Sequence, residues 1–340
     1  MKTTKFAYYL EQYFRHYLPN IKGCTVATID SYRHAFILFL NFMEEKNIAA
    51  NKIEITDITY KNILNFLDWL QSKRKNSVSS RNHRQAVINS FIKFLMYEFP
   101  DYLNEFQAII NIPIKKAPKK EIAYLKTEGV KLLFKQINLN TKNGFRDYTM
   151  LMLMYTTGLR VTELINIKLK DVSLQTPATL LVHGKGQKRR YVPLTKIAVD
   201  ILKKYINNEK LDNNADSHEW LFKNHMNEQF TRQGINYIVN KYSNCAKKVN
   251  PTLIPDNFSP HKMRHTTAME LVTSGVDLIY IRDLLGHVSV LTTEIYAKAD
   301  ANKKREAIEL VSKQLVKKVE AKWEKNENLK DWLKSFNRRL

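Results

Sequence analysis

Six side chains in the second half of the sequence have the chemical types that an enzyme needs to break a phosphodiester bond. They are two arginines, two histidines, a lysine and a tyrosine: Arg160, Lys185, His261, Arg264, His287 and Tyr296. Guanidinium groups stay protonated and pair with phosphoryl oxygens, so two arginines from separate segments can clamp one phosphate and stabilise its transition state. No cluster of acidic metal ligands accompanies them. The set suits the cleavage of a DNA phosphodiester by a tyrosine nucleophile.

The arginines and the tyrosine stand in local sequences that fit these roles. Arg160 follows a glycine that ends the preceding expected helix, and Glu163 lies three residues on, where it can hold the guanidinium in place. His261 and Arg264 are also three residues apart and project from nearly the same helical face. Tyr296 needs help to ionise, because a phenol has a pKa of about 10. We expect the arginines to supply positive charge and His261 to accept the proton.

Lys185 and His287 complete the set. Lys185 lies at the tip of an expected hairpin of two strands, 179–183 and 188–194, where it can protonate a leaving 5′-oxygen. His287 can hydrogen-bond a phosphoryl oxygen. Considered singly, each residue has an ordinary alternative: Lys185 as part of a basic turn, His287 as a structural histidine, and Tyr296 as one of 17 tyrosines with a core or surface place.

Neither a metal nor a cofactor is expected. His261 and His265 are spaced like two ligands of a zinc site, but no nearby Cys, Glu or third His completes that site. The two cysteines, Cys24 and Cys245, are isolated in sequence and form neither a CxxC motif nor a disulfide framework.

The charge balance favours a polyanionic partner. The chain holds 55 Lys and Arg against 33 Asp and Glu, a formal net charge of +22. Such an excess supports DNA binding through counterion release. The alternatives are a basic protein with no nucleic-acid partner or one that binds acidic lipid. No run of about 20 apolar residues predicts a membrane span, and the first residues lack an apolar signal core, which favours an intracellular protein.

The length allows two domains. Residues 1–110 carry apolar residues at helical spacing in four segments, the first over residues 4–18 and the second with Thr28 as the expected N-cap. Residues 111–121 contain two prolines and four lysines and are expected to be an extended basic linker. Residues 122–302 are expected to mix helices with the hairpin, and residues 303–340 are expected to form an amphipathic tail.

Basic side chains near one helix start of the first domain, in the linker and beside the hairpin are expected to contact the DNA backbone. The alternative is a solvated basic surface. The residues are Lys73, Arg74, Arg81, Arg84, Lys115, Lys116, Lys119, Lys120, Lys188 and Arg189.

In order and spacing, these residues resemble the tyrosine recombinase (phage integrase) family. The matching runs are 157–164, 184–188, 261–266 and 285–287, with Tyr296 nine residues beyond His287. The resemblance implies that the six residues form one pocket in which Tyr296 makes a 3′-phosphotyrosyl intermediate, so that strand exchange needs neither ATP nor a metal. It implies a mainly α fold with a small β-sheet. A four-helix SAM-like core-binding domain and an α+β catalytic domain then form a C-shaped clamp on DNA.

The resemblance also implies the partners. They are double-stranded DNA with inverted-repeat core sites and further copies of the chain, as a dimer on one site and a tetramer that passes through a Holliday junction, in the bacterial cytoplasm at the nucleoid. Residues 292–300 and 304–309 most resemble recombinases of mobile elements, which favours integration and excision.

Several alternatives stay open. A chromosome-dimer resolvase belongs to the same family, a type IB topoisomerase shares the tyrosine pocket, and a third possibility is a DNA-binding module without catalysis. The tail is expected to dock on a neighbouring protomer, and the alternative is packing on its own domain.

Overall fold

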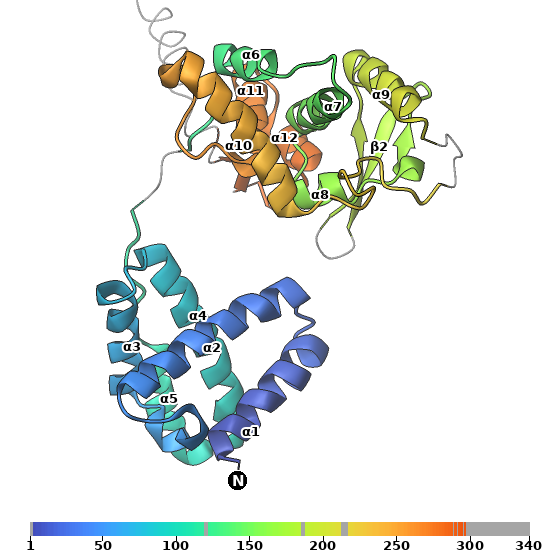
Figure 1. Ribbon diagram of the computed structural model, residues 1–340. Helices are drawn as coiled ribbons and strands as arrows, with labels where there is room; N and C mark the ends of the chain where they lie inside the picture. Colours follow the sequence, from blue (N-terminus) through green and yellow to red (C-terminus); the bar gives the residue numbers. More distant parts are fainter. Residues whose placement is uncertain are drawn as a thin grey trace, which may run out of the picture. The chain divides into compact units, whose positions relative to one another are not determined.

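The computed structural model describes residues 3–118, 122–184, 188–211, 217–287, 289–290, 292–294 and 296. The chain separates into two compact units, Met1–Lys120 and Glu121–Leu340, and the division falls within the segment 111–121 (Figure 1).

The first unit is helical. Its helices are α1 (Lys5–Gln12), which continues as a π-helix (Tyr13–Ile21), α2 (Val26–Glu45), α3 (Tyr60–Ser72), α4 (Val78–Glu98) and α5 (Leu103–Ile110), with single 3₁₀ turns at Ala50–Lys52, Ile55–Asp57 and Pro100–Tyr102.

Hydroxyl side chains begin four of these helices. Thr4, Thr25, Thr59 and Ser77 each accept a hydrogen bond from a backbone N–H of the first turn. The expectation that Thr28 caps the second helix was wrong: Thr25 is the cap, so the helix begins earlier than its apolar pattern predicts. Helix α5 was not predicted, because its eight residues are too short to show a clear period.

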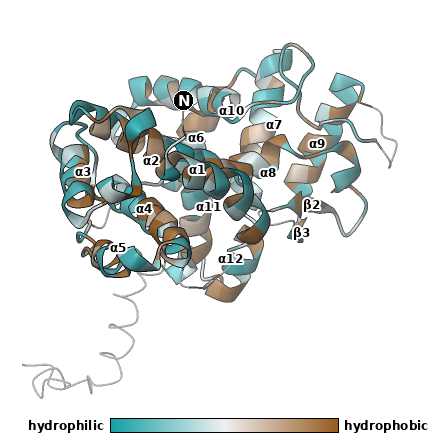
Figure 2. Cartoon of the chain, turned by 90° about the horizontal axis from the view of Figure 1, so that it is seen from below, coloured by the Kyte–Doolittle hydropathy of each residue, from teal (hydrophilic) through white to brown (hydrophobic). Residues whose placement is uncertain are grey.

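Aromatic rings fill the core of the first unit. Phe91 of α4 lies edge-on to Phe6 of α1 and to Phe36 of α2, with ring centroids 5.9 and 5.1 Å apart. Figure 2 shows helices with hydrophobic residues on one side and hydrophilic residues on the other, as expected for elements that bury one face.

The second unit combines helices with a small sheet. The elements are α6 (Thr127–Lys135), α7 (Lys142–Thr157), α8 (Val161–Ile165), β1 (Val172–Ser173), β2 (Thr179–His183), β3 (Arg189–Pro193), α9 (Lys196–Glu209), α10 (Arg232–Val249), α11 (Pro260–Thr273) and α12 (Leu278–Leu285), with 3₁₀ turns at Leu169–Asp171 and Pro251–Leu253. The three strands are antiparallel in the order β1-β2-β3. The predicted hairpin is therefore present, with a short third strand beside it.

Two glycines end the helices α7 and α12. Gly158 ends α7 and Gly286 ends α12, both in the left-handed conformation that glycine adopts without strain. A Cβ on Gly158 would lie 2.4 Å from Leu285, and one on Gly286 would lie 2.8 Å from the Arg190 guanidinium. Both glycines therefore permit the ends of α7 and α12 and the side chain of Arg190 to come close together.

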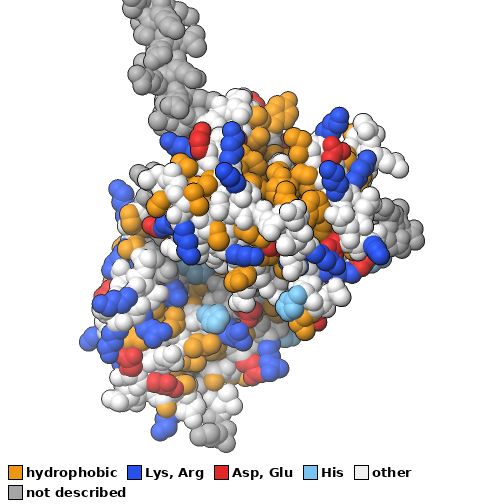
Figure 3. Space-filling view, turned by 45° about the horizontal axis from the view of Figure 1, so that its top comes forward, with side chains coloured by type: hydrophobic (Ala, Val, Ile, Leu, Met, Phe, Trp, Pro, Cys, Tyr) orange, Lys and Arg blue, Asp and Glu red, His pale blue; other side chains and the backbone are white. Residues whose placement is uncertain are grey.

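Lys and Arg side chains are spread over the face shown in Figure 3, with fewer acidic side chains between them.

Within the part of the chain that the structure describes, no helix is long and apolar enough to cross a membrane.

Candidate active site

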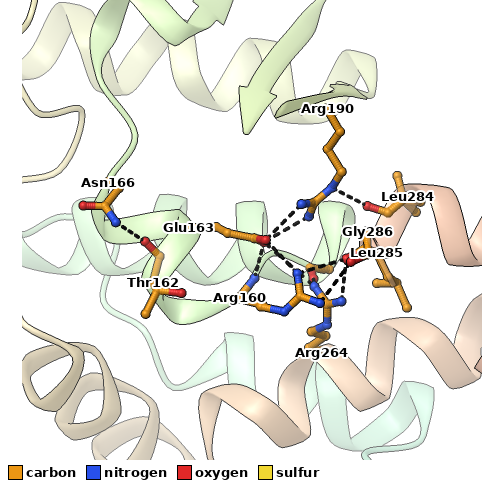
Figure 4. Close-up of polar contacts among 10 residues, drawn as sticks. Arg160, Thr162, Glu163, Asn166, Arg190, Arg264, Leu284, Leu285 and Gly286 are labelled. Carbon is orange, nitrogen blue, oxygen red and sulfur yellow. Dashed lines mark hydrogen bonds and ion pairs between the residues drawn. The ribbon is translucent and has the colours of Figure 1, made fainter. Parts of the chain in front are cut away.

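Three arginines converge on the carboxylate of Glu163 (Figure 4). Glu163, in the first turn of α8, is only 4% exposed. Arg160 donates from Nη1 to Oε1 at 2.8 Å, and Arg190 forms a bidentate pair with both oxygens at 2.9 Å. Nη1 of Arg264 lies 3.9 Å from Oε2. Three positive charges share one negative charge, so the cluster retains a net positive charge that favours an anion.

Hydrogen bonding keeps Glu163 ionised. Burial alone would raise the pKa of its carboxyl, but the hydrogen bonds from Arg190 and from the backbone and side chain of Arg160 outweigh burial and lower that pKa. The prediction that Glu163 holds Arg160 agrees with this geometry.

The C-terminal end of α12 gives the same arginines a second set of partners. Arg264 donates to the carbonyl of Leu285 at 2.5 Å, Arg160 to that of Gly286 at 3.1 Å, and Arg190 to that of Leu284 at 3.0 Å. The last carbonyls of a helix have no partner within the helix and lie at the negative end of its dipole. Backbone carbonyls therefore orient the guanidinium groups.

Arg264 also connects two helix ends. Its Nη1 donates to the carbonyl of Gly158 at 2.7 Å, at the end of α7, and its side chain is almost completely buried. Burial and the charge of Arg160 lower the pKa of Arg264 to about 10, so the guanidinium is still protonated at neutral pH.

Tyr296 and three histidines lie beside this cluster. The phenol of Tyr296 is 2% exposed, and its Oη lies 2.8 Å from Nδ1 of His265. The ring of His287 is nearly parallel to that of Tyr296, with centroids 6.4 Å apart, and its Nδ1 lies 3.0 Å from Oγ1 of Thr293. The rings of His261 and His265 meet edge to face at 4.2 Å.

The histidines are neutral at neutral pH. Burial and the nearby arginines lower the pKa of His287 to about 4. Burial, His261 and Arg264 lower the pKa of His265 to about 4, and partial burial with Arg264 and Arg160 also lowers that of His261.

Burial and positive charge act on Tyr296 in opposite directions. Burial raises the pKa of its phenol, whereas the charges of Arg264 and Arg160 lower it. The net pKa is above the ordinary value of a phenol, so the isolated protein holds Tyr296 protonated. Tyr296 is thus close enough to these arginines for their charge to stabilise its phenolate.

The structure brings most of the predicted pocket together. Arg160, Glu163, Arg264, His287 and Tyr296 are linked by the contacts above, and His261 packs on His265 at their edge. Lys185 lies outside the described residues.

The sequence motifs did not assign two residues, Arg190 and His265, to the site. Arg190 stands in a run of basic residues that looks like a solvated turn, but strand alternation places it on the same side of β3 as the buried Val192. His265 was considered only as half of a zinc site. Within the described part of the chain, no group of three His, Cys, Asp or Glu can hold a metal ion, and His265 contacts Tyr296 instead.

The predicted DNA-contact residues have different surroundings. Lys73, Arg74, Lys115, Lys116, Lys188 and Arg189 are exposed. Arg81 is 1% exposed and donates to Gln85 at 2.5 Å, so the prediction that it contacts a phosphate backbone is wrong for this conformation. Arg84 is half-buried and donates to the Ser80 carbonyl. Lys119 and Lys120 lie outside the described residues.

Arg190 yields a first testable prediction. Arg190→Ala removes both hydrogen bonds to Glu163 and the one to Leu284, so the arginine cluster loses the contact that ties it to β3. We expect strand cleavage on a short nicked substrate to slow by about 10²-fold, as misplacement of a reacting group does. Arg282→Ala, which removes an arginine that pairs with the exposed Asp283, is the matched control and should cleave at the parent rate. Equal rates for the two variants would contradict the positioning role.

Two known protein-family models match this chain. The family model described as the phage integrase family matches residues 123–303, and the one described as the phage integrase N-terminal SAM-like domain matches residues 10–98. The first match alone covers more than half of the chain. This chain belongs to the phage integrase family. It is a tyrosine site-specific recombinase with a SAM-like domain followed by a catalytic domain, as the resemblance implied.

Its relatives are recombinases and integrases. A putative integrase/recombinase, y4rC, of Sinorhizobium fredii is 31% identical over 300 residues, which cover 88% of this chain and 89% of that protein. Tyrosine recombinase XerC of Staphylococcus epidermidis is 30% identical over 291 residues, 84% of this chain and 91% of that one.

Solved structures share the fold. The Tn1549 transposon integrase in complex with transposon right end DNA has a TM-score of 0.68 at 14% identity, covering 89% of this recombinase and 98% of that chain. The XerH recombinase bound to palindromic difH substrate has a TM-score of 0.66 at 22% identity, covering 86% and 82%.

Proposed function

We propose that this recombinase cuts and rejoins double-stranded DNA at a specific site with Tyr296 as nucleophile. The observation that carries the proposal is that Tyr296, in contact with His265 and His287, lies beside the cluster in which Arg160, Arg190 and Arg264 surround Glu163. A scissile phosphate placed between the guanidinium groups meets both the charge that stabilises its transition state and the attacking oxygen.

The chemistry balances without a metal or an external energy source. The Tyr296 oxygen attacks phosphorus, the bond to the 5′-oxygen breaks, and a 3′-phosphotyrosyl bond forms. The phenol gives up its proton to an acceptor in the pocket, and the leaving 5′-oxygen takes one. Attack by a second 5′-hydroxyl then reverses the step on another strand, and exchange of one strand pair gives a Holliday junction.

Lys185 is the proposed donor of the proton to the leaving 5′-oxygen. A 5′-bridging sulfur in place of that oxygen leaves as a thiolate, which needs far less protonation because thiols are much stronger acids than alcohols. We therefore expect Lys185→Ala to cleave an ordinary substrate about 10²- to 10⁴-fold more slowly than the parent and to cleave the sulfur-containing substrate at nearly the parent rate. An equal loss on both substrates would show that Lys185 is not the acid.

The proposed partners are a duplex with inverted-repeat core sites and other copies of this chain, two on one site and four in the synapse. DNA binding is assigned to residues 1–110 and the linker 111–121, and catalysis to residues 122–302. Exposed side chains such as Lys73, Arg74, Lys115 and Arg189 support the assignment of the backbone contacts. A DNA substrate would place the enzyme in the bacterial cytoplasm, at the nucleoid.

Integration and excision of a mobile element is the role we favour. The similarity in fold to the Tn1549 transposon integrase supports it. Chromosome-dimer resolution is the second candidate, because curated relatives that match at about 30% identity are XerC recombinases.

The tail, residues 303–340, lies outside the described residues, and we propose that it docks on a neighbouring protomer. Deletion of residues 303–340 should then leave binding to a single site nearly unchanged and abolish synapsis, as measured by the mobility of the two complexes in a native gel. A truncated protein that recombines two sites at the parent rate would contradict docking in trans.

A strand-exchange assay tests the proposed function against DNA relaxation. Plasmids that carry candidate sites from the flanks of the gene are incubated with the protein, and the joined products are sequenced. The proposal predicts junctions at one defined position in two sites. A topoisomerase of type IB would instead relax supercoiled plasmids as a monomer and join no sites.

A further inference from the structure

The hydroxyl of the proposed nucleophile contacts a residue outside the six that the sequence singled out. Oη of Tyr296 lies 2.8 Å from Nδ1 of His265. We propose that His265 positions Tyr296 for attack by accepting the phenol's hydrogen bond at Nδ1. This inference rests on the proposed function, since it assigns a role in the same cleavage step.

The surrounding structure fixes the position of His265. It follows Arg264 directly on α11, and Arg264 is anchored by its hydrogen bonds to Gly158 and Leu285. The ring of His265 is held between the edge-to-face contact with His261 and the ring of Tyr296, whose centroid lies 5.5 Å away. The imidazole therefore has little freedom to turn, and its Nδ1 is a fixed acceptor for Oη.

The protonation states give the hydrogen bond its direction. Burial, His261 and Arg264 lower the pKa of His265 to about 4, while burial keeps the pKa of the Tyr296 phenol high. At neutral pH the imidazole is therefore neutral and the phenol protonated. The phenol O–H donates, Nδ1 accepts, and the imidazole proton is on Nε2.

The consequence for catalysis is orientation. With its proton directed at His265, the phenol oxygen keeps its lone pairs free for a phosphorus atom that approaches from the side of the arginines. Without the acceptor, the phenol can turn its O–H elsewhere, for example toward a phosphoryl oxygen, where the proton blocks attack. His265 thus acts through Tyr296, whereas the arginines act on the phosphate.

Three substitutions at one position test this role. His265→Asn keeps a hydrogen-bond acceptor near the place of Nδ1, His265→Gln moves the amide to the place of Nε2, and His265→Phe keeps a ring and removes both nitrogens. Single-turnover cleavage is measured on a nicked substrate at saturating DNA, together with the DNA dissociation constant and the thermal midpoint of each variant.

We expect His265→Asn to cleave within about tenfold of the parent, the effect of a weakened hydrogen bond. His265→Gln and His265→Phe should cleave about 10²-fold more slowly, because the nucleophile is misoriented. All three should bind DNA like the parent, and the Asn and Gln variants should share the same thermal midpoint. Rescue by Asn but not by Gln separates positioning of Oη from a packing role.

Two results would overturn the inference. Equal rates for the parent and all three variants would show that the hydrogen bond has no role in cleavage, and an equal loss in all three would show that the ring matters only for packing. Failure of the proposed function gives a different result: the parent itself would form no adduct, or Tyr296→Phe would still form it. In that case both proposals fall.

Discussion

The Tyr296→Phe variant is expected to bind its DNA site as tightly as the parent protein and to form no covalent complex with it. The substitution removes one oxygen and keeps the ring that packs against His265 and His287. The folded state loses a single hydrogen bond, to His265, so the free energy of unfolding should change by only about 0.5–1.5 kcal/mol. The reaction loses its nucleophile, and no adduct should accumulate on a nicked substrate.

The matched control is Tyr280→Phe. Tyr280 lies on α12 and is 71% exposed, so the loss of its hydroxyl should alter neither adduct formation nor stability. Denaturing gels of the two variants after incubation with labelled DNA give the comparison directly. A slow-migrating adduct that persists in Tyr296→Phe would assign the nucleophile to another residue.

Replacing Arg264 should have the next largest effect, on both cleavage and folding. Arg264→Ala removes a charge at the proposed phosphate site, and loss of one such donor typically slows a reaction by about 10²- to 10³-fold. It also leaves the carbonyls of Gly158 and Leu285 without this donor, at a cost of about 1–3 kcal/mol for each buried group. We therefore expect a lower thermal midpoint together with a large loss of cleavage.

Arg264→Lys separates the two effects. A lysine keeps the charge but not the planar fork that reaches both carbonyls, so it should restore part of the stability and little of the rate. Arg282→Ala, on the neighbouring helix α12 and paired with the exposed Asp283, is the control for loss of an arginine. Rates are compared at a temperature at which every variant is folded. Cleavage within about tenfold of the parent by folded Arg264→Ala would contradict its role at the phosphate.

The order of the motifs in the sequence predicted much of the site, because a helix end, a helix start and a favourable residue spacing occur there within a few residues. Gly158 ends a helix and Arg160 begins the next, and Glu163 follows at the spacing that returns its carboxylate to the arginine. These relationships lie within one or two helical turns, where sequence spacing fixes which side chains meet. The predicted hairpin has the same basis, since its strands are adjacent in sequence.

What sequence reasoning missed depends on contacts between distant segments. Arg190 meets Glu163 and the end of α12 only because β3 folds against both, and 94 residues separate it from Leu284. His265 meets Tyr296 across 31 residues. The basic residues around Arg81 predict a surface cation, yet its side chain turns inward to Gln85, which in turn donates to the carbonyl of Ile112. No local pattern encodes the contacts of Arg190, His265 and the Gln85 amide with segments that are distant in sequence.

The most direct test of the proposed role of Tyr296 is to find the residue that is joined to DNA. The protein is trapped on a nicked substrate and digested with protease and nuclease, and the peptide that carries a nucleotide is sequenced by mass spectrometry. We expect one modified peptide, with a 3′-phosphate of the cleaved strand on the oxygen of Tyr296. A nucleotide on any other residue, or an adduct through the 5′-phosphate, would contradict it.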